Sequence, residues 1–404
     1  MNNDLITNRD IVIVGQQPWD VEIGSNCKDI ALEFAKHNRV LYVNSPLDRI
    51  TLYKHKQEAK IRKRLDVING KQNSIEKIKD NLWNLFPDRM IESINWIKSQ
   101  WLFEFLNKSN NKKFAASIQK AINQLGFKNI ILFNDNDMFR CFYLKELLKP
   151  AVSIYYSRDY MLAVDYWKLH GEKSEPELIA KSDICVANST YLANYCKKYN
   201  PHSFYVGQGC ELDVFMNVAD KKKPGDILAI PSPIIGYVGA LQSLRLDLNV
   251  IAHIAAANTE WSIILVGPED DEFKKSSLHQ IKNVYFIGSK NPTQLPSYIN
   301  AFDVCINPQI VSQVTIGNYP RKIDEYLAVG KPVVATKTEA MSIFSEHTYL
   351  ATSKEEYVTL IEKALQEDND TLRNNRKNFA SSHTWENSVT EIYAAIYLLD
   401  KSKS

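Results

Sequence analysis

The stretch with the clearest chemical content runs from residue 317 to residue 336 and reads G-N-Y-P-R-K-I-D-E-Y-L-A-V-G-K-P-V-V-A-T. Pro320 suits the first turn of a helix, because its missing N–H costs nothing there. A helix N-terminus carries partial positive charge and favours an anion such as a diphosphate. Lys322 in that turn would oppose the dipole unless an anion is bound, and Glu325 can accept hydrogen bonds from sugar hydroxyls. The segment therefore predicts one helix that binds both phosphate and ribose.

The elements that must position these residues follow from the local pattern. Apolar residues recur at three- and four-residue spacing over residues 323–327, so a short helix is expected to begin near Tyr319. Gly330 predicts a left-handed helix end, and the Lys-Pro pair after it prevents continuation. Residues 333–335 are a β-branched run typical of a buried strand in a parallel sheet.

The pattern P-x-K-x-x-E-Y-L-A-x-G-K-P-V-V-A-T resembles the nucleotide-binding segment of GT-B glycosyltransferases, especially the family 4-like bacterial enzymes (glycosyl transferases group 1) that build surface polysaccharides. The resemblance implies that Glu325 binds the donor ribose and that the helix start holds the diphosphate. Donor contacts are accordingly expected from Gly317, Asn318, Tyr319 and Lys322. One position departs from the family, which often carries a glutamate eight residues before Glu325; here that residue is Gly317, as in a branch that uses the P-x-K form.

Two further loops are similar to donor-binding loops of the same family. Gly239 ends a predicted strand and is followed by A-L-Q-S-L-R-L-D, a segment in which relatives place an arginine against the donor phosphates. The resemblance implies this role for Arg245, and a surface ion pair with Asp247 or another acid is the alternative. Gly288 and Ser289 match the place whose backbone contacts the nucleobase in relatives.

Other acidic residues have structural alternatives. Glu325 could instead pair with Arg321 one turn earlier. Glu269 or Asp270 is expected to cap the helix that follows it. Asp303 at the start of a predicted strand is expected to accept hydrogen bonds from nearby amides.

Length and composition indicate two globular domains with separate cores, because the chain has 404 residues of which 45% are hydrophobic and 11% aromatic. The formal net charge of +2 favours no polyanionic partner, and no nucleic acid is expected. The six cysteines are scattered and are interpreted as buried free thiols, which indicates a reducing compartment. Neither a signal peptide nor an apolar run of about 18 residues is evident. We expect a cytoplasmic protein, with the inner face of the plasma membrane as a further location.

Strands and helices alternate along both halves of the chain. Predicted strands of the first half are residues 10–15, 40–43, 129–133, 151–156, 182–187 and 203–206, with helices at 138–148 and 190–198. The second half has predicted strands at 234–239, 261–267, 284–287, 303–307 and 348–351, with helices at 246–257, 271–281 and 293–301. This alternation predicts an α/β protein with doubly wound parallel sheets.

The resemblance implies the GT-B fold, in which two Rossmann-like domains face a central cleft. The expected division is an acceptor-binding domain over residues 1–215, a linker over 216–233, a nucleotide-sugar-binding domain over 234–383, and a C-terminal helix over 384–404 that crosses back to the first domain. Ile392, Tyr393, Ile396 and Leu399 are spaced as one face of that helix.

Residues 53–79 carry nine Lys or Arg against three acids, and an aromatic-rich segment follows up to residue 103. One interpretation is a solvated basic face beside an ordinary amphipathic helix. The other is a peripheral membrane surface, with basic residues near anionic lipid and Trp or Phe in the interface. An enzyme that glycosylates a lipid-linked acceptor needs such a surface.

Catalytic candidates in the first half are Asp159, Asp20 and His170, which follow predicted strands or helices and could equally be cap or turn residues. An inverting enzyme would need one of them as a general base. Family 4 relatives retain the anomeric configuration, which requires no dedicated base. We expect neither a metal nor another cofactor.

The resulting hypothesis is a glycosyltransferase that moves a sugar from a UDP- or GDP-sugar to a glycan or lipid-linked acceptor in bacterial polysaccharide biosynthesis. A nucleotide-sugar epimerase of the same fold and a non-catalytic nucleotide- or glycan-binding subunit are the alternatives. A dehydrogenase is disfavoured, because neither half contains the G-x-G-x-x-G fingerprint.

Overall fold

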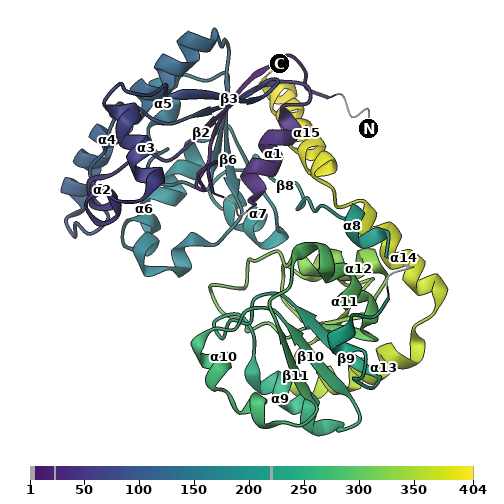
Figure 1. Cartoon of the computed structure of the whole chain (residues 1–404). Coiled ribbons are helices and arrows are strands. Elements are labelled where there is room, and N and C mark those ends of the chain that lie inside the picture. The colour runs from purple at the N-terminus through teal and green to yellow at the C-terminus, as the bar shows by residue number, and fades with distance from the viewer. Residues whose placement is uncertain (1–4, 22–23, 219–221, 404) are drawn as a thin grey trace. The chain divides into compact units, whose positions relative to one another are not determined.

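The structure is a computed structural model that describes residues 5–21, 24–218 and 222–403 (Figure 1). The chain divides into two compact units: unit 1 comprises Met1–Gly207 and Trp385–Ser404, and unit 2 comprises Gln208–Thr384. Four short stretches lie outside the described residues. They are residues 1–4 at the N-terminus, 22–23 in the loop after the first strand, 219–221 in the predicted linker, and residue 404.

Unit 1 contains an eight-stranded sheet in the order β3-β4-β2-β1-β5-β6-β7-β8. Its strands are β1 (Asp10–Val14), β2 (Arg39–Val43), β3 (Ile75–Lys79), β4 (Leu82–Leu85), β5 (Ile131–Asp135), β6 (Val152–Ser157), β7 (Ile184–Ala187) and β8 (Ser203–Tyr205). All neighbours are parallel except β3 and β4. The six predicted strands are confirmed within two residues. The β3–β4 pair was missed, because β3 reads as a charged segment without a buried face.

Helices cover both faces of this sheet. They are α1 (Asn26–Phe34), α2 (Arg49–His55), α3 (Ala59–Ile68), α4 (Gln100–Leu125), α5 (Leu144–Leu148), α6 (Asp165–Lys181), α7 (Thr190–Lys197) and α15 (Trp385–Lys403), with a 3₁₀ turn η1 (Met161–Ala163). Alternating strand residues divide between the faces: Ile13 and Phe133 pack with α1 and α15, whereas Val12 and Leu132 pack with α4 and α5.

The helix predicted over residues 138–148 forms only at its end, as α5. The buried Asp137 accepts hydrogen bonds from the backbone N–H groups of Phe139 (3.1 Å) and Arg140 (2.9 Å). This local side-chain capping holds residues 138–143 in turns that compete with a regular helix.

The C-terminal helix α15 packs on unit 1, beside α1 and β7 (Figure 1). Its predicted apolar face is confirmed, because Ile392, Tyr393, Ile396 and Leu399 are all buried in the same core as α1. The Tyr393 hydroxyl also accepts a hydrogen bond from the Asn38 side chain (2.9 Å).

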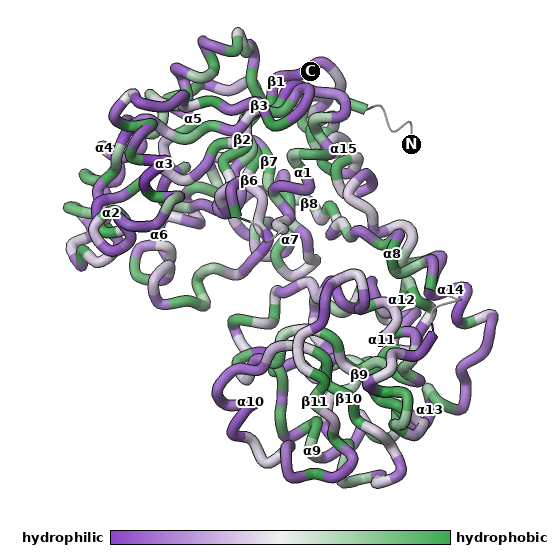
Figure 2. Tube along the Cα trace, viewed as in Figure 1, coloured by the Kyte–Doolittle hydropathy of each residue, from purple (hydrophilic) through white to green (hydrophobic). Residues whose placement is uncertain are grey.

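Unit 2 contains a six-stranded parallel sheet in the order β11-β10-β9-β12-β13-β14. Its strands are β9 (Ile234–Val238), β10 (Ser262–Val266), β11 (Val284–Gly288), β12 (Val304–Asn307), β13 (Val333–Thr336) and β14 (Tyr349–Ala351). All six were predicted. Figure 2 shows hydrophobic residues concentrated along the strands around β9 and β11 and hydrophilic ones along the outer loops.

The helices of unit 2 also form two layers, one with α11, α12 and α14 and one with α9 and α13. The elements are α8 (Asp213–Met216), η2 (Gly225–Ile227), α9 (Leu248–Ala257), α10 (Asp271–Lys275), η3 (Ser277–Gln280), η4 (Pro292–Gln294), α11 (Leu295–Ala301), α12 (Lys322–Val329), η5 (Ser342–Phe344), α13 (Lys354–Glu367) and α14 (Asp370–Ser381). The helix predicted over residues 271–281 is split, because Ser276 is extended (φ −69°, ψ 152°) between α10 and η3.

The domain boundary predicted at residue 215 is wrong by eight residues. Cys210, Leu212 and Phe215 are buried in the core of unit 2, so the chain leaves unit 1 after Gly207. The predicted linker is not an extended tether either, because Ile227 is fully buried in the same core.

The basic, aromatic region of unit 1 is partly structural. Arg64 is buried and pairs with Asp20, and the ammonium of Lys63 lies 4.3 Å from the centre of the Phe86 ring. Phe103 is a core residue, whereas Trp96 and Trp101 are 70% and 73% exposed. No helix within the described residues is long and apolar enough to cross a membrane.

Replacing Ile396 by Ala should lower the free energy of unfolding of unit 1 by about 2–5 kcal/mol, because the side chain is buried between α15 and the sheet and its loss leaves a cavity. Urea denaturation followed by circular dichroism measures the change. Leu398→Ala in the same helix is the matched control: that side chain is 54% exposed and its loss should cost less than about 0.5 kcal/mol. Equal losses from both variants would contradict the packing of α15.

Candidate donor site and first-unit polar cluster

The strand order of unit 2 places a crevice at the carboxyl ends of β9 and β12. Successive strands run from β9 through β10 to β11 on one side and from β12 through β13 to β14 on the other. A ligand in such a sheet binds where the strand order reverses. Here the two strands pair only at Ile235 and Gly236 of β9, so they diverge before β9 ends at Val238.

The helix α12 closes this divergence. The hydroxyl of Tyr326, fully buried on α12, accepts a hydrogen bond from the Val238 N–H (2.8 Å) and donates one to the Val238 carbonyl (3.3 Å). These are the backbone groups that a paired β12 would have satisfied, and buried backbone groups of this kind need partners. The start of α12 is thereby fixed at the end of β9.

Lys322, the first residue of α12, extends to the same strand end. Its ammonium donates a hydrogen bond to the Tyr237 hydroxyl (2.8 Å) and lies 4.7 Å from the centre of that ring. A Cβ placed on Gly239 would lie 3.4 Å from the ammonium nitrogen. Among the described residues no carboxylate forms an ion pair with Lys322, so the positive charge at this end of α12 is held by an aromatic ring and a hydroxyl.

The predicted start of this helix near Tyr319 is wrong, because α12 begins at Lys322. Pro320 and Arg321 form a turn in which the Ile323 N–H bonds to the Pro320 carbonyl (2.9 Å). The Arg321 side chain makes no capping bond to the helix. Tyr319 is buried, and its ring lies 5.3 Å from that of Phe344, so its side chain belongs to the core.

The remaining loop candidates precede that turn. Gly317 is buried and Asn318 is half-buried, and the Asn318 N–H bonds to the Thr315 carbonyl (3.0 Å) within a tight turn. Their backbone is therefore ordered by local hydrogen bonds, and their contact with a donor stays a prediction.

Three glycines end the neighbouring strands β9, β10 and β11. The Gly239 N–H bonds to Val266 (2.9 Å), and the Gly267 N–H bonds to Gly288 (3.0 Å). Gly267 has a φ of 153°, and a Cβ there would lie 1.9 Å from the Gly239 carbonyl oxygen. The loops thus pack against each other at a distance that only glycine allows, and Ser289 follows as an exposed residue.

Arg245 lies in the loop after β9, and its backbone connects the two sides of the crevice. Its carbonyl accepts a hydrogen bond from the Ile310 N–H (2.9 Å), in the loop after β12. The side chain is exposed, and in the described part of the chain no carboxylate lies within salt-bridge distance of it. Asp247, the alternative partner, caps α9 through the N–H groups of Asn249 (2.9 Å) and Val250 (3.3 Å).

Glu325 lies in the first turn of α12 and is half-buried. Burial raises its pKa from 4.5 to about 7, and the positive charges of Arg321 and Lys322 act in the opposite direction. The alternative of a direct salt bridge with Arg321 is not found among the described residues. The two other acidic expectations are confirmed: Asp270 caps α10 through the Phe273 N–H (2.9 Å), and Asp303 accepts from the Ile234 N–H (2.6 Å).

The sequence analysis did not predict a hydrogen-bond network on the buried face of α12. Asp324 is fully buried, and its carboxylate contacts His383 Nδ1 (2.6 Å) and the Cys210 thiol (3.4 Å). Cys210 and His383 lie close to the two points where the chain passes between the units, and the Cys210 N–H bonds to the His383 carbonyl (3.0 Å). Asp324 of α12 therefore contacts a residue near each of the two chain segments that connect the units. An acid between the apolar residues Ile323 and Leu327, on the apolar face of the predicted helix, was the available signal.

The three catalytic candidates of unit 1 are not brought together. Asp20 pairs with Arg64 of α3 (2.8 Å). His170 is buried in α6, and its ring nitrogens contact Gln100 (2.9 Å) and the Ile97 carbonyl (2.7 Å). Its ring stacks on Phe103, and burial lowers the pKa of the imidazole. This placement argues against the prediction of His170 as a general base and gives it a core role.

Asp159 follows β6 and belongs to a polar cluster at the point where the strand order of unit 1 reverses, between β1 and β5. The fully buried Asp135 ends β5 and accepts a hydrogen bond from Arg158 Nε (2.8 Å), and Arg158 also contacts Asp159 (2.8 Å) and Gln16 (3.2 Å). Arg158 was missed as a candidate, although an arginine directly after a strand was visible in the sequence. Of the three candidates, Asp159 alone lies at this strand-order reversal.

The two units, each a sheet covered by helices on both faces, define the GT-B fold. Solved structures with this likeness include sucrose-phosphate synthase from Thermosynechococcus elongatus (TM-score 0.67, 14% identity, covering 98% of this chain and 100% of that one). Another is HepE from Anabaena in complex with UDP (TM-score 0.64, 13% identity, covering 96% of this chain and 99% of that one).

Residues 232–367 match the protein family described as Glycosyl transferases group 1, so unit 2 carries a domain of that family. A relative with sequence similarity is the putative teichuronic acid biosynthesis glycosyltransferase TuaH of Bacillus subtilis, 25% identical over 227 residues. The match covers 53% of this chain and 56% of the relative, so the chain spans little more than half the length of the protein it matches.

The raised pKa of Glu325 predicts a pH dependence of stability. The folded state binds this proton more tightly than the unfolded state, so the stabilisation is complete below pH 4.5 and is lost as the pH rises through about 7. Between these limits wild type should lose up to about 3 kcal/mol relative to Glu325→Gln, measured by urea denaturation at stepped pH. Glu362→Gln, which changes an exposed carboxylate of α13, should follow wild type. Parallel curves for wild type and Glu325→Gln would contradict the burial of this carboxylate.

Proposed function

We propose that the protein is a glycosyltransferase that moves a sugar from a nucleotide-sugar to a glycan or lipid-linked acceptor. One observation carries the proposal: at the strand-order reversal of unit 2, Lys322 begins a helix beside glycine-lined strand ends and has no carboxylate partner within the described part of the chain. Such a site fits a diphosphate, because open helix ends and lysine both favour phosphate oxygens. Glu325 in the same turn would then bind the ribose.

The comparisons support a nucleotide-sugar as the donor. The family matched by unit 2 is one of glycosyl transferases, and HepE was solved with UDP and with UDP-glucose. We infer a UDP- or GDP-linked sugar as the substrate of this protein. The printed role of TuaH in teichuronic acid biosynthesis supports a bacterial surface polysaccharide as the product.

The proposed chemistry follows from charge. Breaking the bond between the anomeric carbon and the phosphate oxygen leaves a negative diphosphate, so groups that stabilise this leaving group accelerate the reaction. Lys322, Arg245 and the start of α12 would supply that stabilisation without a metal ion. In the retaining reaction that we propose, the acceptor hydroxyl attacks the same face and passes its proton to the departing phosphate oxygen.

A general base would be needed only for inversion, and Asp159 is then the candidate of choice. Its carboxylate is 43% exposed and pairs with Arg158, so it is accessible to a substrate. We further propose that the protein works in the cytoplasm, at the inner face of the plasma membrane. The exposed Trp96, Trp101 and Phe105 of unit 1 support such a peripheral contact.

Nucleotide binding tests the donor site directly. UDP or GDP should raise the melting temperature of the wild-type protein, because a ligand that binds only the folded state stabilises it by about 2.7 kcal/mol at 100 times its Kd. Glu325→Ala and Arg245→Ala should each lose most of this shift and keep their unliganded melting temperature within a few degrees. Glu362→Ala should behave as wild type. Full shifts in both site variants would place the nucleotide elsewhere.

Turnover distinguishes a transferase from a binding subunit. With UDP-sugars or GDP-sugars and no acceptor, slow release of free sugar and nucleoside diphosphate is expected, measured by chromatography over hours. Lys322→Gln should reduce the rate at least tenfold, because it removes the charge that stabilises the leaving diphosphate. Binding without any release would support a non-catalytic subunit, and conversion to an isomeric nucleotide-sugar would support an epimerase.

A further inference from the structure

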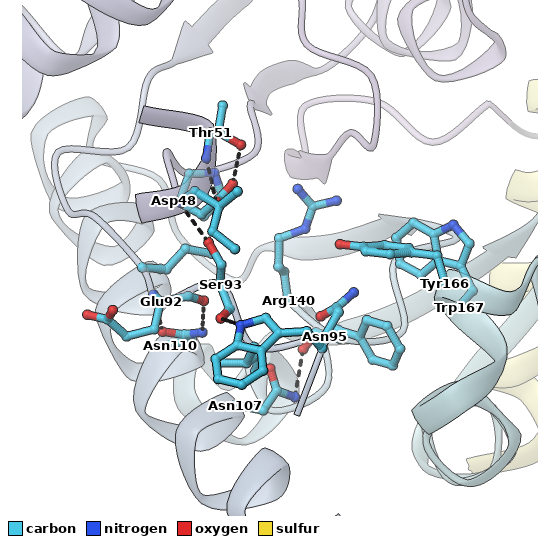
Figure 3. A pocket seen from close by; sticks show the side chains of 16 residues that line it. Asp48, Thr51, Glu92, Ser93, Asn95, Asn107, Asn110, Arg140, Tyr166 and Trp167 are labelled. Carbon is cyan, nitrogen blue, oxygen red and sulfur yellow. Dashed lines mark hydrogen bonds between the residues drawn. The ribbon is translucent and has the colours of Figure 1, made fainter. Parts of the chain in front are cut away.

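Unit 1 contains a cavity of about 440 Å³ that is separate from the Asp135–Arg158 cluster (Figure 3). It is lined by the loop from β2 into α2, by residues 91–96 after β4, by Phe139 and Arg140 after β5, and by the start of α6. This volume lies within the range of about 300–1,000 Å³ that is usual for small-molecule sites.

The acidic residues of this cavity are engaged by the protein. The Asp48 carboxylate accepts hydrogen bonds from the Thr51 N–H (3.0 Å) and hydroxyl (2.6 Å) and from the Ser93 hydroxyl. Glu92 pairs with Arg49 (2.6 Å) and Lys113 (3.6 Å). Asp48 is therefore hydrogen-bonded to neutral groups, and the charge of Glu92 is paired with two cations.

Arg140 is the cationic residue of the lining, and an ion pair with Asp137, which lies outside the lining, fixes its orientation. Its Nε donates to the carboxylate of Asp137 (2.5 Å), a residue that is 1% exposed. In Figure 3 the guanidinium lies in the open part of the cavity, between Asp48 and Tyr166, with no bond to the other residues drawn. Its two terminal nitrogens thus form a fork of donors that fits the paired oxygens of a carboxylate or phosphate.

Aromatic rings and an amide line the same cavity. Tyr166 is 60% exposed, and Trp167 stacks on Phe139 with 5.4 Å between ring centres. The indole N–H of Trp96 donates to the Ser93 carbonyl (2.8 Å), which orients the ring at the rim. Asn95 presents its side-chain amide to the cavity (Figure 3). Flat rings cover the apolar faces of a ligand, whereas the amide and phenol bind hydroxyl groups.

We propose that this cavity binds an anionic saccharide, a sugar unit that carries a carboxylate or a phosphate, with Arg140 as the anion-binding residue. The lining also includes Ile50, Ile91 and Ile94, which can contact the apolar faces of a sugar ring, whereas an uncharged lipid chain would give Arg140 no hydrogen-bond partner. A neutral sugar would leave the guanidinium fork without its counter-charge. That the saccharide is the acceptor end of a growing chain rests on the proposed glycosyl transfer, but its binding does not.

The test is a titration of the full-length protein, without nucleotide, followed by saturation-transfer NMR and tryptophan fluorescence. Glucuronate and glucose 6-phosphate represent the two anions, glucose is the neutral match, and inorganic phosphate is the anion without a sugar. At least one anionic sugar should bind at least tenfold more tightly than both glucose and phosphate. Equal binding of glucose, or binding of phosphate alone, overturns the proposal.

Variants locate the site. Arg140→Gln should weaken binding of the anionic sugar at least tenfold, because a hydrogen-bonded charge pair is lost. Asn95→Ala, which leaves the Arg140–Asp137 pair intact, should weaken it severalfold and keeps the test valid if Arg140→Gln does not fold. Arg62→Gln, an exposed change on α3 outside the cavity lining, should have no effect. Unchanged affinity in both Arg140→Gln and Asn95→Ala overturns the assignment.

Nucleotide binding at the candidate donor site distinguishes a failure of the saccharide proposal from a failure of the glycosyltransferase proposal. The UDP or GDP shift in melting temperature should be the same in Arg140→Gln and wild type. If anionic sugars bind but no nucleotide does, the glycosyl-transfer proposal fails and the saccharide site remains. If UDP competes with the sugar for the cavity, or if vesicles of anionic phospholipid bind and the sugars do not, the saccharide site is refuted.

Discussion

The donor site depends on the divergence of two parallel strands. Because β9 and β12 separate before β9 ends, the backbone of Val238 needs partners from outside the sheet, and the Tyr326 hydroxyl supplies both hydrogen bonds. A buried backbone group without a partner is costly, so this one side chain fixes where α12 begins relative to the sheet. The position of Lys322 at the end of β9 follows from it.

The strand-order reversal of unit 1 has a buried ion pair, whereas that of unit 2 has the start of a helix. At its own strand-order reversal a fully buried carboxylate, Asp135, is compensated by Arg158, whose guanidinium reaches on to Asp159 and Gln16. A buried ion pair of this kind contributes little net stability, because desolvation offsets the attraction. The structural effect of this pair is to orient Asp159, which Arg158 contacts at 2.8 Å.

The start of α12 and the cavity of unit 1 are each supported by a buried aspartate that the sequence analysis did not single out. Asp324, on the hidden face of α12, contacts His383 and Cys210, which lie beside the two chain crossings. In the same way, Asp137 lies outside the cavity lining of unit 1 but sets the direction of Arg140.

The sequence by itself determined the two α/β sheets, all strands of unit 2 and the buried face of α15, because period-two and period-3.6 patterns and Gly-Pro signals are local. It did not determine β3 and β4, the start of α12 or the unit boundary at Gly207, since these depend on packing against distant residues. Only the tertiary structure decided that His170 belongs to the core and that Asp135 meets Arg158. Contacts of this kind are fixed by strand order, which no single stretch of sequence encodes.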